Sequence, residues 1–447
     1  MTKKMAVLIL AAFAAGSLAL AADFPLKVKS LTSEEAMRLP GGFGAMGQVA
    51  TAKPPAISKE PKAVSKHPLY GTFITPNVSP EAAKSGLAFR LDESKGDGKG
   101  YDRLIIDFDG NGDLTDDAVI KGAMETSAGG SPEITMFGPI EAPAGKRTGA
   151  WQPTYHAQMY LFNRSLIKTS GTNYIGYLRL KAGNYLETTV DIGGVKQRIA
   201  LVDGDCNLRI GDKPAAQEQQ IGPNERTTYF SPADTILRDR DGTGKYQNET
   251  DAECFGNIIY FGPAPYNMTL AKDMAAVQLE PYSGPTGELT AANGDKVGAL
   301  TVAWESAPGK WEPLSPDVSS GKAKVPAGSY RLYACALTAK AGDGATLMIS
   351  GTNRTGKAST VKVAEGKSAA LECGTPIDLQ VKAEKREGPT RGASMLSINV
   401  SIVGAGGEVY NSFAKMANGQ PAQLDPPKFK VLDQKEQILA SGQLEFG

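Results

Sequence analysis

The feature that most constrains the fold is the way short β-rich runs alternate with clusters of Gly, Pro, Asn and Asp. In runs such as 178–181 and 198–201, apolar and polar residues approximate the period of two that a half-buried antiparallel strand requires. Long stretches with the apolar period of a helix are absent, and 51 Gly and 28 Pro in 447 residues supply many turns. We therefore expect a mostly β protein built from multi-stranded antiparallel sheets.

Length and turn spacing suggest how the chain divides. A chain of this length with 41% hydrophobic residues can bury two cores. The β-rich runs separate into a block over 67–283, which contains three acidic loops, and a second block over 284–447. Clear turn signals between the runs of the second block are typical of an immunoglobulin-like β-sandwich. We therefore predict an antiparallel β domain followed by an immunoglobulin-like sandwich.

The chain begins with a pattern typical of a secretory signal peptide. Lys3 and Lys4 provide a charged start, residues 5–20 form an apolar run, and 19–21 read as a small-x-small cleavage site. This run is slightly short for a membrane span of about 20 residues, and no stop-transfer charges follow it. We expect residues 1–21 to be cleaved and the mature protein to be exported to the periplasm, cell surface or medium with no membrane span. An uncleaved membrane anchor is the alternative.

The segment after the signal peptide, 22–66, is rich in Gly, Pro and Lys, so we expect a flexible tether with one short helix that is capped by the run 32–35 and ends before Pro40. The chain as a whole has 48 basic and 48 acidic residues. With no basic excess to neutralise phosphates, an electrostatic nucleic-acid binder is excluded.

Export would place the four cysteines in an oxidising compartment, where disulfides persist. No C-x-x-C motif is present, so zinc and thioredoxin-like chemistry have no support. Cys206 and Cys254 lie in the first β block and Cys335 and Cys373 in the second, so we expect the bridges 206–254 and 335–373. Four buried free thiols are the alternative.

The segment 107–117 carries the most specific motif, a dense series of oxygen-bearing side chains after a predicted strand. Calcium prefers about six to eight oxygen ligands and tolerates irregular geometry. The first nine positions resemble an EF-hand loop, with glycine at the sixth, although Ala118 replaces the closing glutamate. The candidate ligands are Asp107, Asp109, Asn111, Asp113 (through its carbonyl), Thr115 and Asp117, with Asp116 as an alternative closing residue. The competing interpretation is a turn whose side chains only cap backbone amides.

Two later loops repeat the Asp-x-Asp spacing after a predicted strand, which suggests an internal repeat. The first has Asp203, Asp205, Asn207 and Asp212 as candidate ligands, but Leu208 replaces the glycine. The second has Asp239, Asp241, Thr243 and Glu249. Glu249 and Asp117 share one offset from the first aspartate of their loops, so we expect the eleventh position to close these sites.

These loops, the run Tyr101-Asp102-Arg103-Leu104 into 107–117, and the ending 429–442 resemble a group of uncharacterised exported β-rich proteins of planctomycete-like and verrucomicrobial bacteria. The resemblance covers about two thirds of the chain. It implies calcium binding and a cell-surface role but no reaction.

The sequence therefore favours an exported calcium-binding structural or interaction module over an enzyme, and no catalytic residue stands out. The sequence does not specify its partner, for which cell-surface polysaccharide and protein are the two candidates. The alternatives are a secreted hydrolase, which would need facing carboxylates in an aromatic-walled cleft, and a carbohydrate-binding module using Trp151, Trp304 and Trp311. We expect those tryptophans to pack in the core and the two histidines to be structural.

Overall fold

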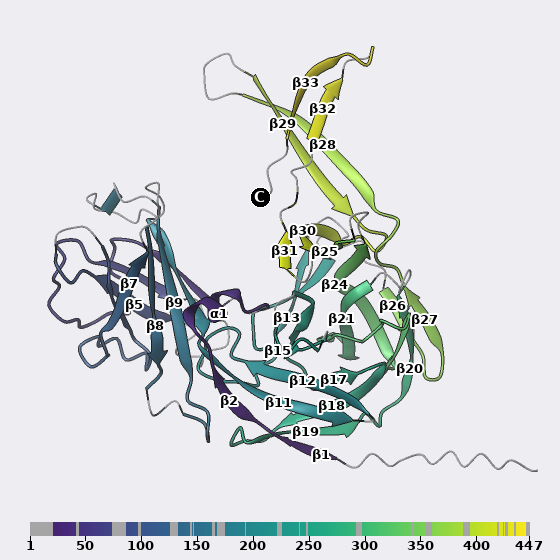
Figure 1. The fold of residues 1–447 in the computed structure, drawn as a ribbon, viewed down its shortest axis with the longest axis horizontal. Coiled ribbons are helices and arrows are strands. Elements are labelled where there is room, and N and C mark those ends of the chain that lie inside the picture. The colour runs from purple at the N-terminus through teal and green to yellow at the C-terminus, as the bar shows by residue number, and fades with distance from the viewer. Residues whose placement is uncertain are drawn as a thin grey trace, which may run out of the picture.

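The structure is a computed structural model and is mostly β, with several antiparallel sheets and an eight-stranded barrel (Figure 1). It describes residues 21–443 except for 42–43, 74–85, 97–99, 126–132, 144, 146, 163–165, 168–174, 193, 221–225, 241, 247–248, 292–296, 341–343, 354–359, 388–393, 418–419, 423, 425–427 and 433–434. The predicted signal peptide thus lies, except for Ala21, outside the described residues. Within them, no helix is both long and apolar enough to cross a membrane.

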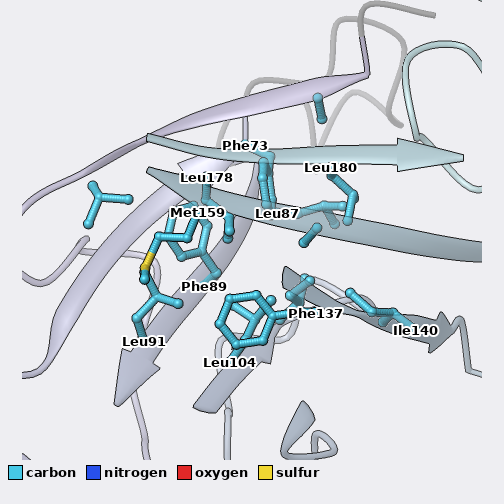
Figure 2. Packing of buried hydrophobic residues seen from close by; sticks show 14 of the residues in the cluster. Phe73, Leu87, Phe89, Leu91, Leu104, Phe137, Ile140, Met159, Leu178 and Leu180 are labelled. Carbon is cyan, nitrogen blue, oxygen red and sulfur yellow. The ribbon is translucent and has the colours of Figure 1, made fainter. Parts of the chain in front are cut away.

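The first structural unit is a closed barrel in the order β10-β3-β4-β5-β6-β7-β8-β9. Its interior is filled by side chains, as expected for eight strands, and Figure 2 shows Phe89, Met159 and Leu178 among those that meet inside. The strands are β3 (Ala45–Val49), β4 (Leu69–Phe73), β5 (Leu87–Asp92), β6 (Arg103–Ile106), β7 (Ile120–Glu125), β8 (Glu133–Glu141), β9 (Thr154–Leu161) and β10 (Gly176–Ala182).

The second unit packs two antiparallel sheets face to face. A four-stranded sheet has the order β1-β19-β18-β17 and a five-stranded sheet the order β16-β15-β12-β11-β2. Leu201 and Ile236 of the larger sheet share a core with Phe261 and Val277 of the smaller one. The strands are β1 (Ala22–Pro25), β2 (Lys27–Ser30), β11 (Asn184–Ile192), β12 (Val195–Val202), β15 (Thr235–Arg238), β16 (Ala252–Cys254), β17 (Ile258–Phe261), β18 (Ala264–Leu270) and β19 (Ala276–Pro281).

The third unit places a three-stranded sheet, β23-β20-β27, against a nine-stranded sheet whose main path is β22-β21-β24-β25-β30-β29-β28. Leu289 and Val325 of the smaller sheet share a core with Val302 and Leu332 of the larger one. The strands are β20 (Thr286–Ala291), β21 (Val297–Ala307), β22 (Lys310–Leu314), β23 (Lys322–Pro326), β24 (Gly328–Lys340), β25 (Thr346–Thr352), β26 (Thr360–Val363), β27 (Ser368–Leu371), β28 (Asp378–Glu387), β29 (Ser394–Val403), β30 (Val409–Ala417) and β31 (Gln420–Ala422).

Few elements lie outside these three units. Two hairpins pair β13 (Ala216–Gln220) with β14 (Arg226–Phe230) and β32 (Lys428–Leu432) with β33 (Ile438–Gln443). The helix α1 (Ser33–Arg38) begins at the predicted cap, where Thr32 and Glu35 form a capping box, and η4 (Glu249–Asp251) is a single 3-10 turn.

The described residues of the expected tether at 22–66 are instead part of the folded body. β1 pairs with β19, β2 pairs with β11, and β3 closes the barrel against β10. Ile57 is 3% exposed and packs with Ala88 and Ile105 on the outer face of the barrel. Composition misled here, because the Gly- and Pro-rich segment gains its order from long-range strand pairing and not from local propensity.

A buried ion pair fixes the last part of this segment. Arg90, which is 1% exposed, donates to Asp92 at 2.6 Å and to the Pro61 carbonyl at 2.6 Å. Asp92 in turn accepts the backbone N–H groups of Val64 and Ser65 at 3.0 and 2.8 Å. Burial alone would raise the pKa of Asp92, but these donors outweigh it and lower the pKa below its usual value.

We predict that Asp92→Ala destabilises the protein by about 3–5 kcal/mol, because the buried Arg90 guanidinium loses its buried carboxylate partner and three backbone N–H groups, those of Val64, Ser65 and Glu93, lose their acceptor. Urea unfolding would measure this loss, and trypsin should then cleave faster after Lys62 and Lys66. Glu34→Ala, which removes only the exposed pair with Arg38, is the matched control and should leave the midpoint in place. Unchanged stability of Asp92→Ala would contradict a stabilising role for the buried pair of Arg90 and Asp92.

All four cysteines are free thiols in the structure, so neither predicted bridge is present. Cys206 packs in the barrel core, with Sγ 3.5 Å from the Leu180 carbonyl oxygen, whereas Cys254 ends β16 in the neighbouring unit. Cys335 and Cys373 share the core of the third unit, and a hydrogen bond between these two thiols, together with burial, raises the pKa of Cys335 well above its usual value.

We predict that oxidised glutathione converts only Cys335 and Cys373 into a disulfide, because these two thiols share one core and contact each other, whereas Cys206 and Cys254 lie in different units. Peptide mapping under non-reducing conditions should show this bridge, and thiol titration of the denatured protein should count two remaining thiols. A bridge that includes Cys206 or Cys254 would contradict the arrangement of the cores.

Candidate metal sites

The first acidic loop joins β6 to β7 and is organised around Asp107, which is 3% exposed. One carboxylate oxygen of Asp107 accepts the N–H groups of Gly110 and Asn111 at 2.8 and 3.1 Å, and the other accepts that of Gly112 at 2.9 Å. Both glycines have positive φ, 76° and 77°, where a side chain is disfavoured. The tight turn predicted at the sixth position is confirmed.

Asn111 lies between two further carboxylates of this loop. Its amide nitrogen is 2.9 Å from Asp109 Oδ2 and 3.0 Å from Asp116 Oδ2, and its backbone N–H also reaches Asp109 Oδ1 at 3.1 Å. The Asn111 amide therefore lies between Asp109 and Asp116, and Asp109 also lies beside Asp107. An NH₂ donor held between two carboxylates marks a point where positive charge is favoured.

The residue that approaches Asn111 is the tenth of the loop, Asp116, and not the predicted eleventh, Asp117. Asp117 is still part of the cluster: one of its oxygens is buried and has no hydrogen-bond partner among the described residues. Burial, followed by the charges of Asp107, Asp109 and Asp116, raises the pKa of Asp117 to about 7. Burial and the neighbouring Asp109 also raise the pKa of Asp107.

The remaining two predicted ligands of this loop are engaged in other contacts. Asp113 pairs with Lys59 at 2.7 Å and accepts the Thr115 hydroxyl at 2.5 Å. Lys59 and Thr115 lower the pKa of Asp113 to about 2. The Asp113 carboxylate therefore serves the contact with the segment around Lys59, which leaves only its carbonyl for the role that the spacing suggested.

The second loop, which follows β12, reproduces the skeleton of the first. Asp203 accepts the N–H groups of Asn207 and Leu208 at 3.0 Å each, as Asp107 accepts those of Asn111 and Gly112. The Asn207 amide lies 3.2 Å from Asp205 and 2.7 Å from Asp212, again at the second-aspartate and tenth positions. The missing glycine does not change the turn, because Leu208 adopts a positive φ of 74°.

This second loop is far more buried and gains a residue that the spacing did not predict. Asp203, Asp205 and Asp234 are at most 2% exposed, and one carboxylate oxygen of each lies within 4.8 Å of the others. Asp234, immediately before β15, accepts the N–H groups of Gly204, Gly211 and Asp212. It lies 31 positions after Asp203 by their numbers in the sequence, so no local motif could identify it.

Burial dominates the electrostatics of this cluster. It raises the pKa of Asp203 well above its usual value, and the charge of Asp205 adds to the effect. Burial, followed by Asp203 and Asp205, likewise raises the pKa of Asp234. Tyr155 of the barrel donates its hydroxyl to Asp203 at 2.5 Å, a further contact that the sequence did not indicate. Carboxylates held this close and out of water require protonation or a cation.

The third loop shares only part of the skeleton. Asp239 accepts the N–H of Gly244 at 3.0 Å, and Gly242 and Gly244 have positive φ values of 69° and 79°, close to those of their counterparts in the first loop. Here, however, the Arg198 guanidinium lies 3.6 Å from Asp239 and supplies a positive charge. Asp241 lies outside the described residues, Thr243 is exposed, and the side chain of Glu249 is not described.

Other candidate sites gain little from the structure. Trp151 and Trp311 are 0% and 8% exposed, as expected for core residues, and Trp304 is partly buried. The His156 ring bonds to Ser33 Oγ and to the Leu31 carbonyl oxygen, which is a structural role. A groove of about 900 Å³ beside α1 is lined by Glu34, Glu35, Tyr185 and Tyr246, among others.

That groove lacks the facing acid and base of a glycosidase. Glu35 belongs to the capping box, where bonds to Thr32 lower its pKa, and Glu34 pairs with Arg38. A general acid needs a raised pKa, whereas the pKa of Glu35 is lowered.

Comparison with known proteins adds no further assignment: no family model, curated protein or solved structure matches this chain.

We predict that Gly112→Ala destabilises the first loop more than Gly110→Ala. Both substitutions force a side chain into the left-handed region, which costs about 1–2 kcal/mol. Only at Gly112 would the new Cβ also lie 2.4 Å from a backbone oxygen, that of Ala56; at Gly110 no atom lies within 4 Å. Thermal unfolding of the two variants gives the comparison, and equal losses would contradict the observed packing.

Proposed function

We propose that this protein is a calcium-binding structural module whose first and second acidic loops each hold an ion. The observation that carries the proposal is the repeated skeleton: an aspartate caps the turn, and an asparagine amide lies between two more carboxylates. In the second loop the capping Asp203 and one of the flanking carboxylates, Asp205, are buried beside Asp234. A turn that merely caps its own amides does not need acidic side chains gathered out of water.

The donor set favours a hard cation such as calcium over metals that prefer nitrogen or sulfur ligands. The gathered groups of both loops are oxygens from Asp and Asn, which suit hard cations. Neither loop offers histidine, and Cys206, although inside the second loop, directs its sulfur to the Leu180 carbonyl. The second site would be held by Asp203, Asp205 and Asp234 with the Asn207 amide oxygen after rotation of that side chain, and the first by Asp107, Asp109, Asn111 and Asp116.

An ion at either loop would stabilise the fold by cancelling repulsion between carboxylates that the chain forces together. Because the unfolded chain does not assemble these groups, binding free energy adds to folding stability. The proposal is limited to two loops, since Arg198 already provides the positive charge beside Asp239. We also propose that the protein is exported. The C-terminal sheets would form an immunoglobulin-like sandwich that serves as a spacer or a binding surface. No described residue favours a hydrolase.

The decisive measurement is thermal unfolding with calcium and with a chelator. We expect calcium at millimolar concentration to raise Tm and the chelator to reverse the rise. Asp205→Asn and Asp109→Asn should each reduce the shift, because each removes a charged ligand, while Asp239→Asn is the matched control and should keep it. Isothermal titration calorimetry would count the ions. A transition that neither calcium nor chelator moves would refute the proposal.

The pH dependence of stability should change sign when calcium is bound. Without metal, the folded pKa of Asp117 lies near 7, above its unfolded value near 3.9. The folded state then binds more protons, so stability falls as the pH rises from about 4 to 7. With saturating calcium, protons compete with the ion for carboxylates, so stability should rise over that range. Urea unfolding at pH 4, 5.5 and 7 tests this, and identical slopes would contradict it.

A further inference from the structure

The nine-stranded sheet ends in a ribbon with an exposed apolar face. Figure 1 shows β28 and β29 extending away from the rest of the third unit. Leu379 and Val381 are each 60% exposed, and Leu396 on the neighbouring strand is 53% exposed. Leu379 lies opposite Ile402, which packs against the core of that unit. The exposed apolar face of the ribbon is therefore the same face of the sheet that packs on the core of the third unit, and it continues past the end of that core.

The same ribbon also has an open backbone edge. β28 is the last strand in the sheet order, so one row of its N–H and C=O groups faces no other strand of that sheet among the described residues. An edge strand with exposed apolar side chains is a template for another strand. Exposed surface of this kind in a folded protein indicates an interaction site.

We propose that β28 pairs with β28 of a second copy of this chain, antiparallel, over residues 377–383. In this register a two-fold axis passes between the two Gln380 residues. Asp378 of each copy then lies opposite Lys382 of the other. On the other face, Leu379 lies opposite Val381 and Ile377 opposite Ala383.

This register is selected by the residues of the strand itself. Directly opposed residues point to the same face of a sheet, so apolar residues must oppose apolar ones. A shift by two residues in one direction places Asp378 opposite Glu384, and a shift by four places Lys382 opposite itself. A shift by six pairs Lys382 with Glu384 but places Val381 opposite Lys385. A shift by two residues in the other direction places no acidic residue opposite a basic one.

A second copy fits this edge because one strand supplies both members of every complementary pair. The charged side chains are free to change partners: Lys382 is 76% exposed and reaches Glu384 at 2.6 Å within its own strand, and Asp378 accepts a bond from Gln380 at 3.3 Å. Exposed pairs of this kind contribute little to stability. Exchanging these contacts within one strand for contacts across the two-fold axis therefore costs little free energy. The new backbone hydrogen bonds between the two strands favour the dimer.

Charge reversal tests the register. Sedimentation velocity of the full-length protein should show the molar mass double from that of one chain as concentration rises. Asp378→Lys and Lys382→Asp should each abolish the doubling, because each places like charges opposite one another, and the double variant should restore it. Lys428→Asp, on the exposed strand β32, is the matched control and should dimerise like the parent.

Three results would overturn the proposal. One is a protein that stays monomeric up to about millimolar concentration. Another is a dimer that survives both single reversals but is lost in Leu379→Ser, which would indicate that the apolar faces stack. The third is loss of the dimer in both single reversals without recovery in the double variant. Circular dichroism and Tm identify any variant that fails to fold. In that case the conservative variants Asp378→Asn and Lys382→Gln replace the charge reversals. We expect each of them to dimerise more weakly than the parent, and unchanged dimerisation would count against the register.

Discussion

The contact between Tyr155 and Asp203 is the constraint on which the arrangement of the first two units depends. Tyr155 belongs to the barrel, and Asp203 begins the loop after β12 of the neighbouring sheets. The same loop inserts Cys206 and Leu208 into the barrel core, and Gly44 donates its N–H to the Gly204 carbonyl at 3.1 Å. The second acidic loop thus fills part of the barrel core and also follows strand β12 of the second unit.

This arrangement explains why the candidate sites lie where they do. Phe108, next to Asp107, stacks on Tyr155 with ring centroids 6.1 Å apart, so one tyrosine contacts both acidic loops. Burial of the second loop follows from its insertion between the units, and burial is what raises the pKa of its carboxylates. A cation there would stabilise the loop and, through it, the packing of the barrel against the sheets.

The turn of the first acidic loop could be predicted from the sequence, but the residue that completes the site could not. Asn111 lies beside Asp109 because alternate residues of a tight turn share one side, and Asp107 accepts the Gly112 N–H at the sharp bend. Both properties are visible in the sequence. The choice of Asp116 over Asp117 depends on which of two adjacent side chains turns toward Asn111, and that is set by packing. Tyr155 and Asp234 carry no local signal, since sheet topology alone brings them to Asp203.

The sequence by itself determined the β character, the positions of the acidic turns and the strand before each, because alternation and turn chemistry act over a few residues. Only the tertiary structure decided that the described residues of 22–66 join the sheets and the barrel, how the strands divide among the three structural units, and which carboxylates share a site. Those outcomes depend on contacts between residues far apart in the chain, such as Arg90 with Pro61 and β1 with β19. Local composition carries no information about such pairings, which form only when separate strands close one sheet.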